Sequence, residues 1–235
     1  MRWPLPSFVD LANMHLYGNL LICGGGPSIA EDLDKIRELR RHGAYIMSCN
    51  KTYDYLRDNG IRADFHALLD PMDWVADYVT RPAKGTKFLI ASQCHRDVYR
   101  KLRDWDCYLW HAHSDFYGVN YPSPILEAEF KNKAWVCVPG PTTVGMRAVY
   151  LGQTMGFRTY HMFGMDSSMV YDAVKKEGRL HAYAKAKPDD AKEGWAKIQT
   201  AAGLQRFYSN EHMARQVEDF DSAMDQFAVL VKLKK

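Results

Sequence analysis

The sequence predicts an α/β fold with a doubly wound, mainly parallel sheet, an inserted loop and a C-terminal helix. Short apolar runs that are typical of buried strands alternate with segments of helical periodicity, and this alternation favours a parallel sheet. A glycine-rich turn joins the first apolar run to the first helical segment. Because 235 residues suffice for one sizeable core, we expect residues 1–235 to form a single domain.

The glycine-rich turn follows an apolar run over residues 19–23, which predicts a strand. Glycines let the backbone turn sharply and approach a ligand closely. Ser28 with Glu31 matches a capping box, so a helix should begin here. The free N–H groups and the dipole of a helix N-terminus attract anions, and a nucleotide phosphate is the natural occupant. The residues expected to hold it are Gly24, Gly25, Gly26, Pro27 and Ser28.

A tight turn without a ligand is the other interpretation of this stretch. The chain has neither the full G-x-G-x-x-G spacing of dinucleotide sites nor the G-x-x-x-x-G-K-[ST] of a P-loop. The helix after the turn is clearly marked, since Ile29, Leu33, Ile36 and Leu39 fall on one face.

Four further apolar runs continue the alternation, and two of them end in a polar residue. Asn50 follows the first, and Asp70 closes the second. The predicted strands are 44–49, 65–69, 87–91 and 107–110, with helices over 52–59 and 96–103. Residues 111–133 then break the rhythm and predict a loop over the sheet edge. Its His111 and His113 could be metal ligands, or they could make ordinary hydrogen bonds, since no third ligand is evident.

The opening pattern recurs later in the chain. A strand over 134–138, a turn over 139–143, a helix that ends at Gly156 and a strand over 159–163 form a second unit. The carboxyl ends of parallel strands share one edge of the sheet, where ligands bind. Turn chemistry explains any one polar residue at a strand end, but five at one edge favour a polar site. These five are Asn50, Asp70, Thr142, Thr143 and Asp166.

The last third of the chain predicts a flap and a helix. Residues 169–206 are rich in Lys, Ala, Gly and Asp with little apolar periodicity, so we expect a mobile flap there. Residues 210–230 predict a helix whose methionines and aromatic residues pack into the core, followed by a frayed basic tail. The polar residues that the flap would offer to the site are Tyr171, Arg179, His181 and Tyr183.

Composition excludes several classes of protein. The net charge of +3 is too small to favour a nucleic-acid partner. The five cysteines match neither a disulfide framework nor a zinc motif. No apolar stretch reaches transmembrane length and no signal peptide is evident, so we expect a soluble, cytoplasmic protein without membrane insertion. An oligomer is compatible with the sequence.

Several short motifs stand in a fixed order over residues 20 to about 220. The set comprises 24–28, 48–50, 60–64 with 69–71, 143–145 and 156–168. In this order they resemble the MptE-like 6-hydroxymethylpterin diphosphokinase domain family, whose domain also forms the core of the Maf flagellin glycosyltransferases. More distantly, the set is similar to bacterial sialyltransferases of the Campylobacter type. The resemblance implies a Rossmann-like fold and transfer from a nucleotide-activated donor.

The resemblance also implies roles for individual residues. In the sialyltransferases, the cytidine nucleotide is bound by the positions that match the glycine-rich turn, Asn50, Thr142 and Thr143. Gly145 is expected to bind the nucleotide with them. A flap histidine near His181 acts as the general base. Flap tyrosines, here Tyr171 and Tyr183, steady the leaving phosphate, and Arg147 or Arg179 could stabilise it.

The leading hypothesis is therefore a nucleotide-sugar-dependent glycosyltransferase that acts on a hydroxyl of a small molecule or glycan and requires no cofactor. Histidine suits the base because its ordinary pKa is about 6.5. Asp70 or Asp166 would hold a ribose or an acceptor hydroxyl. The plainer interpretation of His181 is a surface loop histidine.

Two alternatives remain open. A diphosphokinase would move pyrophosphate from ATP to a pterin-like alcohol and would need Mg²⁺ held by carboxylates such as Asp70, Asp73 and Asp166. A non-catalytic nucleotide-binding subunit would bind a donor without turnover.

Overall fold

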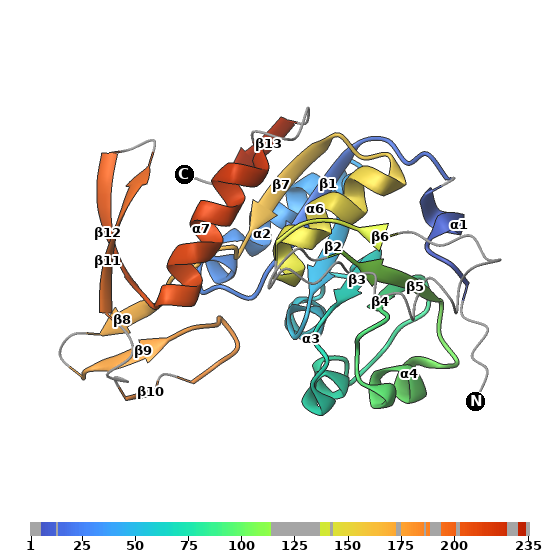
Figure 1. The fold of residues 1–235 in the computed structure, drawn as a ribbon, viewed down its shortest axis with the longest axis horizontal. Coiled ribbons are helices and arrows are strands. Elements are labelled where there is room, and N and C mark those ends of the chain that lie inside the picture. Colours follow the sequence, from blue (N-terminus) through green and yellow to red (C-terminus); the bar gives the residue numbers. More distant parts are fainter. Residues whose placement is uncertain are drawn as a thin grey trace.

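The computed structural model describes residues 6–12, 14–113, 137–141, 143–172, 175–185, 187–188, 194–200, 203–224 and 230–233. Its main sheet contains β1 (Asn19–Cys23), β2 (Tyr45–Cys49), β3 (Phe65–Leu68), β4 (Lys87–Ala91), β5 (Cys107–Ala112), β6 (Cys137–Val138), β7 (Thr159–Phe163) and β13 (Leu230–Leu233). These eight strands lie in the order β13-β7-β1-β2-β3-β4-β5-β6, and every neighbouring pair is parallel (Figure 1). The predicted parallel sheet is confirmed.

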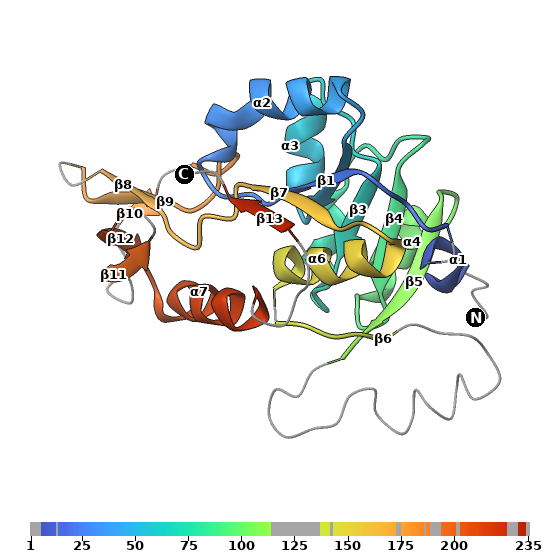
Figure 2. The same ribbon diagram turned by 90° about the horizontal axis from the view of Figure 1, so that it is seen from above.

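Helices cover both faces of the sheet. The helices of the described residues are α1 (Val9–Ala12), α2 (Ile29–Arg41), α3 (Thr52–Asp58), the 3₁₀ helix η1 (Asp73–Tyr78), α4 (Arg96–Leu102), α6 (Val144–Met155) and α7 (Glu211–Met224). Figure 2 shows α2 and α3 above the sheet and α6 and α7 below it. The chain is therefore a doubly wound, Rossmann-like α/β fold, as the sequence predicts.

The direction of winding reverses between β1 and β7. The chain leaves β1 towards β2 on one side and leaves β7 towards β13 on the other, while β1 and β7 pair directly from Asn19–Thr159 to Cys23–Phe163. In open α/β sheets, ligands bind outside the carboxyl ends of strands at such a reversal. The loops after β1 and β7 are therefore the first place to look for a site.

The predicted apolar faces form the core. In α2, Ile29 and Ile36 are buried, and Leu33 and Leu39 pack against the core. In α6, Val144, Ala148, Leu151 and Met155 are buried, and the helix ends at Gly156, whose φ of +112° favours glycine. No helix among the described residues is long and apolar enough to span a membrane. All five cysteines are free thiols.

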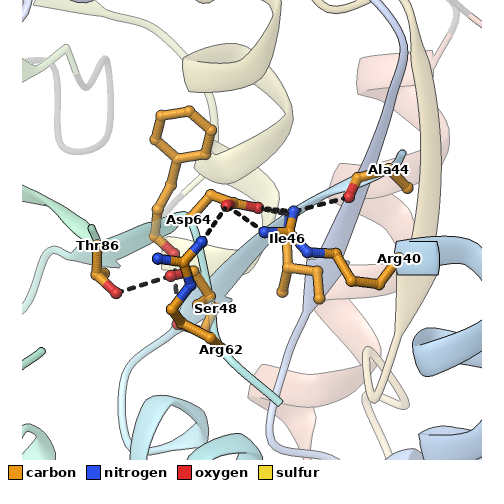
Figure 3. Close-up of polar contacts among 9 residues, drawn as sticks. Arg40, Ala44, Ile46, Ser48, Arg62, Asp64 and Thr86 are labelled. Carbon is orange, nitrogen blue, oxygen red and sulfur yellow. Dashed lines mark hydrogen bonds and ion pairs between the residues drawn. The ribbon is translucent and has the colours of Figure 1, made fainter. Parts of the chain in front are cut away.

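One of the short motifs named above, residues 60–64, stabilises the sheet. Asp64 precedes β3, and its carboxylate accepts hydrogen bonds from the Arg40 guanidinium and, at 2.9 Å, from the Ile46 backbone N–H (Figure 3). Thr86 ties the same region together, because its hydroxyl donates to the Ala63 carbonyl at 2.7 Å. Arg40, on a basic stretch of α2, is thus tied to the sheet.

The flap region has more regular structure than the sequence predicts. It contains β8 (Val170–Asp172), β9 (Glu177–Arg179), β10 (Lys187–Pro188), β11 (Gly194–Thr200) and β12 (Gly203–Ser209). These strands form two small antiparallel sheets, one of three strands and one of two, beside α7 (Figure 1). Main-chain hydrogen bonds hold such ribbons, so a sequence without apolar alternation does not reveal them.

The C-terminal end of the chain also differs from the predictions. The helix expected from residue 210 to 230 ends at Met224, and Leu230–Leu233 is an edge strand parallel to β7 instead of a frayed tail. A four-residue strand is too short for a periodic signal. Near the N-terminus, the short helix α1 covers only four residues. Outside the described residues lie the predicted strand residues 134–136 and most of the loop predicted over 111–133.

Candidate functional site

Both predicted turns follow the carboxyl ends of parallel strands, as the sequence predicts, and the first turn of α6 comes close to the glycine-rich turn. Met165, in the loop after β7, lies between the N-terminus of α6 and the glycine-rich turn. A Cβ on Gly24 would lie 2.6 Å from the Met165 sulfur, and a Cβ on Gly145 would lie 2.2 Å from the Met165 terminal methyl group. Met165 therefore fills the space between Gly24 and Gly145, and neither glycine can carry a side chain without moving it.

The Asp166 side chain, from the loop after β7, lies at the N-terminus of α2. Its carboxylate accepts hydrogen bonds from the Ser28 backbone N–H at 2.8 Å and from the Ser28 hydroxyl at 2.5 Å. The predicted capping box is wrong, because the Ser28 side chain makes no cap hydrogen bond within α2 and its backbone is already helical. A carboxylate from a loop far along the chain takes the place of the local cap.

The glycines of the turn are explained by protein contacts. A Cβ on Gly26 would lie 2.5 Å from a carboxylate oxygen of Asp166, and one on Gly25 would lie 2.5 Å from the Tyr183 hydroxyl. Each glycine therefore makes room for a group from the loop after β7 or from the flap. Their contact with a nucleotide stays a prediction.

Residues 180–184 cover the glycine-rich turn. The Ala182 N–H donates to the Gly25 carbonyl at 3.0 Å, and the Tyr183 ring lies over Gly25. His181 stacks on Tyr183 with ring centroids 5.0 Å apart and 19° between planes. The Lys51 amine lies 5.8 Å from the Tyr183 ring centroid. Burial raises the pKa of Tyr183 to about 12, so its hydroxyl is a hydrogen-bond donor at neutral pH.

His181 has the properties of a general base. Burial lowers its pKa, the Lys51 charge lowers it further, and a hydrogen bond with the Gly25 backbone opposes the shift. The ring is therefore neutral near pH 7. Its buried Nδ1 atom has no hydrogen-bond partner among the described residues. A neutral imidazole with a free nitrogen can accept a proton from a substrate.

Asn50 and Asp70 form a second polar pair at the same edge. The Asn50 side-chain amide donates to the Asp70 carboxylate at 3.1 Å, and Asn50 has a φ of +50°, a conformation that Asn tolerates. Burial raises the pKa of Asp70, and the bond from Asn50 opposes this shift. Asp70 is thus poised to accept a hydrogen bond from a hydroxyl group.

A buried cation lies at the N-terminus of α6. Thr143 caps this helix, since its hydroxyl accepts from the Met146 N–H at 3.4 Å. Arg147, on the first turn, is only 2% exposed and donates to the Val138 carbonyl at 2.7 Å. It forms no ion pair with an acidic group of the described residues, and burial lowers its pKa to about 10. Thr142 lies outside the described residues.

The remaining predicted residues lie away from this arrangement or are exposed. Tyr171 stacks on Tyr208, with ring centroids 4.0 Å apart, in a small separate cluster with Met169 and Met213. Arg179 lies on β9 and is half-buried. Asp73 is exposed, and its carboxylate accepts from the Trp74 N–H. Within the described part of the chain, no three or more His, Cys, Asp or Glu side chains form a metal-binding group.

Sequence reasoning missed Lys51, Tyr78 and Met165, which all contact or adjoin the site. Lys51 directly follows Asn50, and Met165 directly precedes Asp166, so adjacency to a polar strand end is the signal that could have found them. No such sequence signal points to Tyr78, because the six residues of η1 are too few to show a helical pattern.

Comparisons with known proteins agree with the fold. The family model described as 6-hydroxymethylpterin diphosphokinase MptE-like matches residues 2–172. The Maf glycosyltransferase from Magnetospirillum magneticum AMB-1 has a similar structure, with a TM-score of 0.66 at 17% identity over 98% of this chain. The matched region is 38% of that glycosyltransferase chain. No curated protein matches the sequence.

Proposed function

The chain belongs to the 6-hydroxymethylpterin diphosphokinase MptE-like family, and on that premise we propose that it is a transferase that uses a nucleotide-activated donor. More specifically, we propose a nucleotide-sugar-dependent glycosyltransferase that acts on a hydroxyl acceptor. The observation that carries this proposal is His181, a neutral base whose buried Nδ1 has no hydrogen-bond partner among the described residues and which is held against the glycine-rich turn where the sheet reverses direction. Glycosyl transfer to a hydroxyl needs such a base.

The donor phosphates are assigned to the N-terminus of α6 rather than that of α2. At α2 the Ser28 N–H already binds the Asp166 carboxylate, so a phosphate there would face a negative charge. At α6 the helix dipole, Thr143 and the buried Arg147 all favour an anion. A buried charge without an acidic partner is costly, and a bound phosphate would relieve that cost.

The proposed reaction is one displacement. The acceptor oxygen attacks the anomeric carbon of the donor sugar, and the bond from that carbon to the phosphate oxygen breaks. The acceptor proton passes to His181, and the nucleotide leaves with the bonding electrons, stabilised by Arg147 and the N–H groups of α6. Asp70, oriented by Asn50, accepts a hydrogen bond from a substrate hydroxyl. Asp166 positions Ser28 and the turn. No metal or other cofactor is required in this scheme.

The second candidate is the Mg²⁺-dependent diphosphokinase, which the family description favours. It would use Asp70 or Asp73 with the substrate phosphates to hold the metal. Asp166 suits this task poorly, because both of its oxygens accept hydrogen bonds from Ser28. A nucleotide-binding subunit without catalytic activity is the third possibility.

Product analysis tests the proposal. The purified protein is incubated with CMP-, UDP- and GDP-sugars, each with EDTA or with Mg²⁺, and release of the nucleotide is measured with and without a pool of glycan acceptors. We expect release from one donor in EDTA and faster release with acceptor. Activity only with ATP, Mg²⁺ and 6-hydroxymethylpterin would select the diphosphokinase, and binding without release would select the subunit.

A further inference from the structure

Lys51 is an exposed cation at the carboxyl edge of the sheet, and the reaction proposed above does not use it. It follows Asn50 directly, two positions after β2 ends. Within the part of the chain that the structure describes, no carboxylate forms an ion pair with Lys51. The Asp70 carboxylate accepts a hydrogen bond from Asn50 instead. The Asp166 carboxylate binds Ser28. Lys51 therefore offers its positive charge to a ligand.

The Lys51 side chain extends to the residues that cover the glycine-rich turn. Its amine lies 5.8 Å from the centroid of the Tyr183 ring, within the range of a cation–π contact. The same ring contacts the turn, since a Cβ on Gly25 would lie 2.5 Å from the Tyr183 hydroxyl. The His181 ring stacks on Tyr183 with ring centroids 5.0 Å apart. One aromatic ring therefore joins the Lys51 charge to the turn and to the proposed base.

Asn50 fixes the backbone that carries Lys51. The Asn50 N–H donates to the Ala67 carbonyl of β3 at 3.3 Å, and the Asn50 carbonyl accepts from the Tyr53 N–H at 3.3 Å. Tyr53 is itself fully buried. The flexible stem of Lys51 therefore starts from a fixed backbone, and its length lets the amine reach Tyr183.

The helix that carries Arg147, the cation already assigned to the donor, meets the same turn one residue away. A Cβ on Gly24 would lie 2.6 Å from the Met165 sulfur, and a Cβ on Gly145, in the first turn of α6, would lie 2.7 Å from that sulfur. Arg147 and Lys51 therefore stand on elements that meet at neighbouring glycines. A nucleotide-activated donor always carries phosphate, whereas a hydroxyl acceptor needs no charge. Phosphate is thus the ligand group that suits both cations.

We infer that Lys51 is a phosphate-binding residue of the donor site: its ammonium group binds the phosphate that leaves with the nucleotide, beside Tyr183 and His181. This inference rests on the proposed function, because the phosphate belongs to the donor proposed there. Negative charge builds up on the phosphate oxygen as its bond to the anomeric carbon breaks, and a cation at this place stabilises it. The leaving phosphate and the base must both lie near that carbon, and the stack of His181 on Tyr183 keeps the base close to Lys51.

The test uses inorganic pyrophosphate, which offers the phosphate groups without a base or a sugar. The full chain, labelled with ¹³C at histidine, is titrated to millimolar pyrophosphate in EDTA at pH 8, where the His181 ring is neutral. NMR follows the His181 ring signal, which His181→Ala assigns. We expect pyrophosphate to shift this signal, because the anion binds beside Tyr183. Lys51→Met should weaken the binding roughly tenfold, and Lys51→Arg, which keeps the charge, should retain most of it.

Lys84→Met is the matched control for the loss of one positive charge. Lys84 is also exposed, but it precedes β4 and so stands at the opposite edge of the parallel sheet. This variant should leave both the affinity for pyrophosphate and the shift of the His181 signal unchanged. A His181 signal that pyrophosphate does not move, or equal affinity of the Lys51→Met and wild-type chains, overturns the inference.

Failure of this inference and failure of the proposed function give different results. Nucleotide binding by the wild-type, Arg147→Lys and Lys51→Met chains is measured on the same preparations. If a nucleotide binds and only Arg147→Lys weakens it, the donor site stands and the role of Lys51 is wrong. If pyrophosphate binds through Lys51 and no nucleotide binds, the phosphate contact stands and the nucleotide donor is wrong.

Discussion

Ser28 is bound to Asp166 twice, through its backbone N–H at 2.8 Å and its hydroxyl at 2.5 Å. The two residues stand at the carboxyl ends of β1 and β7, where the sheet reverses direction. The pair joins the N-terminus of α2 to the loop that carries Met165. It replaces the local cap that the sequence predicts.

Asp166→Asn should lower the free energy of unfolding by about 1–3 kcal/mol, because the carboxylate satisfies two donors at a helix N-terminus. Urea denaturation followed by circular dichroism measures this. Asp34→Asn is the control, since Asp34 is on the same helix and its side chain is 98% exposed. An equally small effect of both variants would contradict the role of Asp166.

Gly25→Val should displace Tyr183 and weaken nucleotide binding, because even a Cβ at this position would lie 2.5 Å from the Tyr183 hydroxyl. Hydrogen exchange at the Ala182 amide, which donates to the Gly25 carbonyl, reports the displacement. Gly178→Ala is the control, since its Cβ would meet only ordinary contacts at 3.6 Å or more. Unchanged protection at Ala182 and nucleotide affinity within about twofold would show that the turn tolerates a side chain.

His181→Ala should lower turnover by roughly 10²–10⁴-fold while donor affinity stays nearly intact, because a general base acts after the donor is bound. Turnover and melting temperature are measured on one preparation. A residue with only a structural role would give a lower melting temperature and normal turnover per folded molecule.

The pH dependence of turnover provides an independent check on His181. Because burial lowers its pKa, the base stays unprotonated at pH 7, and activity should fall only as the pH drops below about 6.5. Removal of the Lys51 charge in Lys51→Met should move this fall to higher pH, since that charge lowers the pKa of His181. A pH profile that Lys51→Met leaves unmoved would argue against His181.

His66 should make the protein sensitive to acid. It is fully buried beside Tyr53, its Nδ1 lies 2.9 Å from the Ser48 hydroxyl, and burial lowers its pKa to about 3. Between pH 6.5 and 3 the unfolded chain binds a proton that the folded chain does not. The free energy of unfolding should therefore fall by up to about 1.4 kcal/mol per pH unit over this range. His66→Gln should flatten this slope, and an unaltered slope would exclude His66 as its source.

The sequence predicts the main sheet well because its signals are local. The apolar run of β1, the helical faces of α2 and α6 and the glycine after α6 each depend on residues within a few positions. The shared edge then follows from parallel topology, which brings Asn50 beside Asp70. Local periodicity and one topological rule account for all of this.

The features that the sequence misses depend on distant partners. Ser28 and Asp166 are 138 positions apart, and the sequence around Ser28 is the same as that of a capping box. The packing of Tyr183 on Gly25 joins residues equally far apart in the sequence, and no local pattern predicts it. The edge strand β13 is fixed by β7 and not by its own composition.

Calorimetric titration with nucleotides in EDTA tests the central claim most directly. CMP, CDP, UDP, GDP and ATP are titrated into the wild-type chain and into Arg147→Lys, which keeps the charge but loses the planar guanidinium. We predict that one nucleotide binds without Mg²⁺ and that Arg147→Lys weakens its binding roughly tenfold, while His181→Ala leaves it unchanged. Binding of none of these nucleotides, or binding that requires Mg²⁺ and ignores Arg147, would contradict the account.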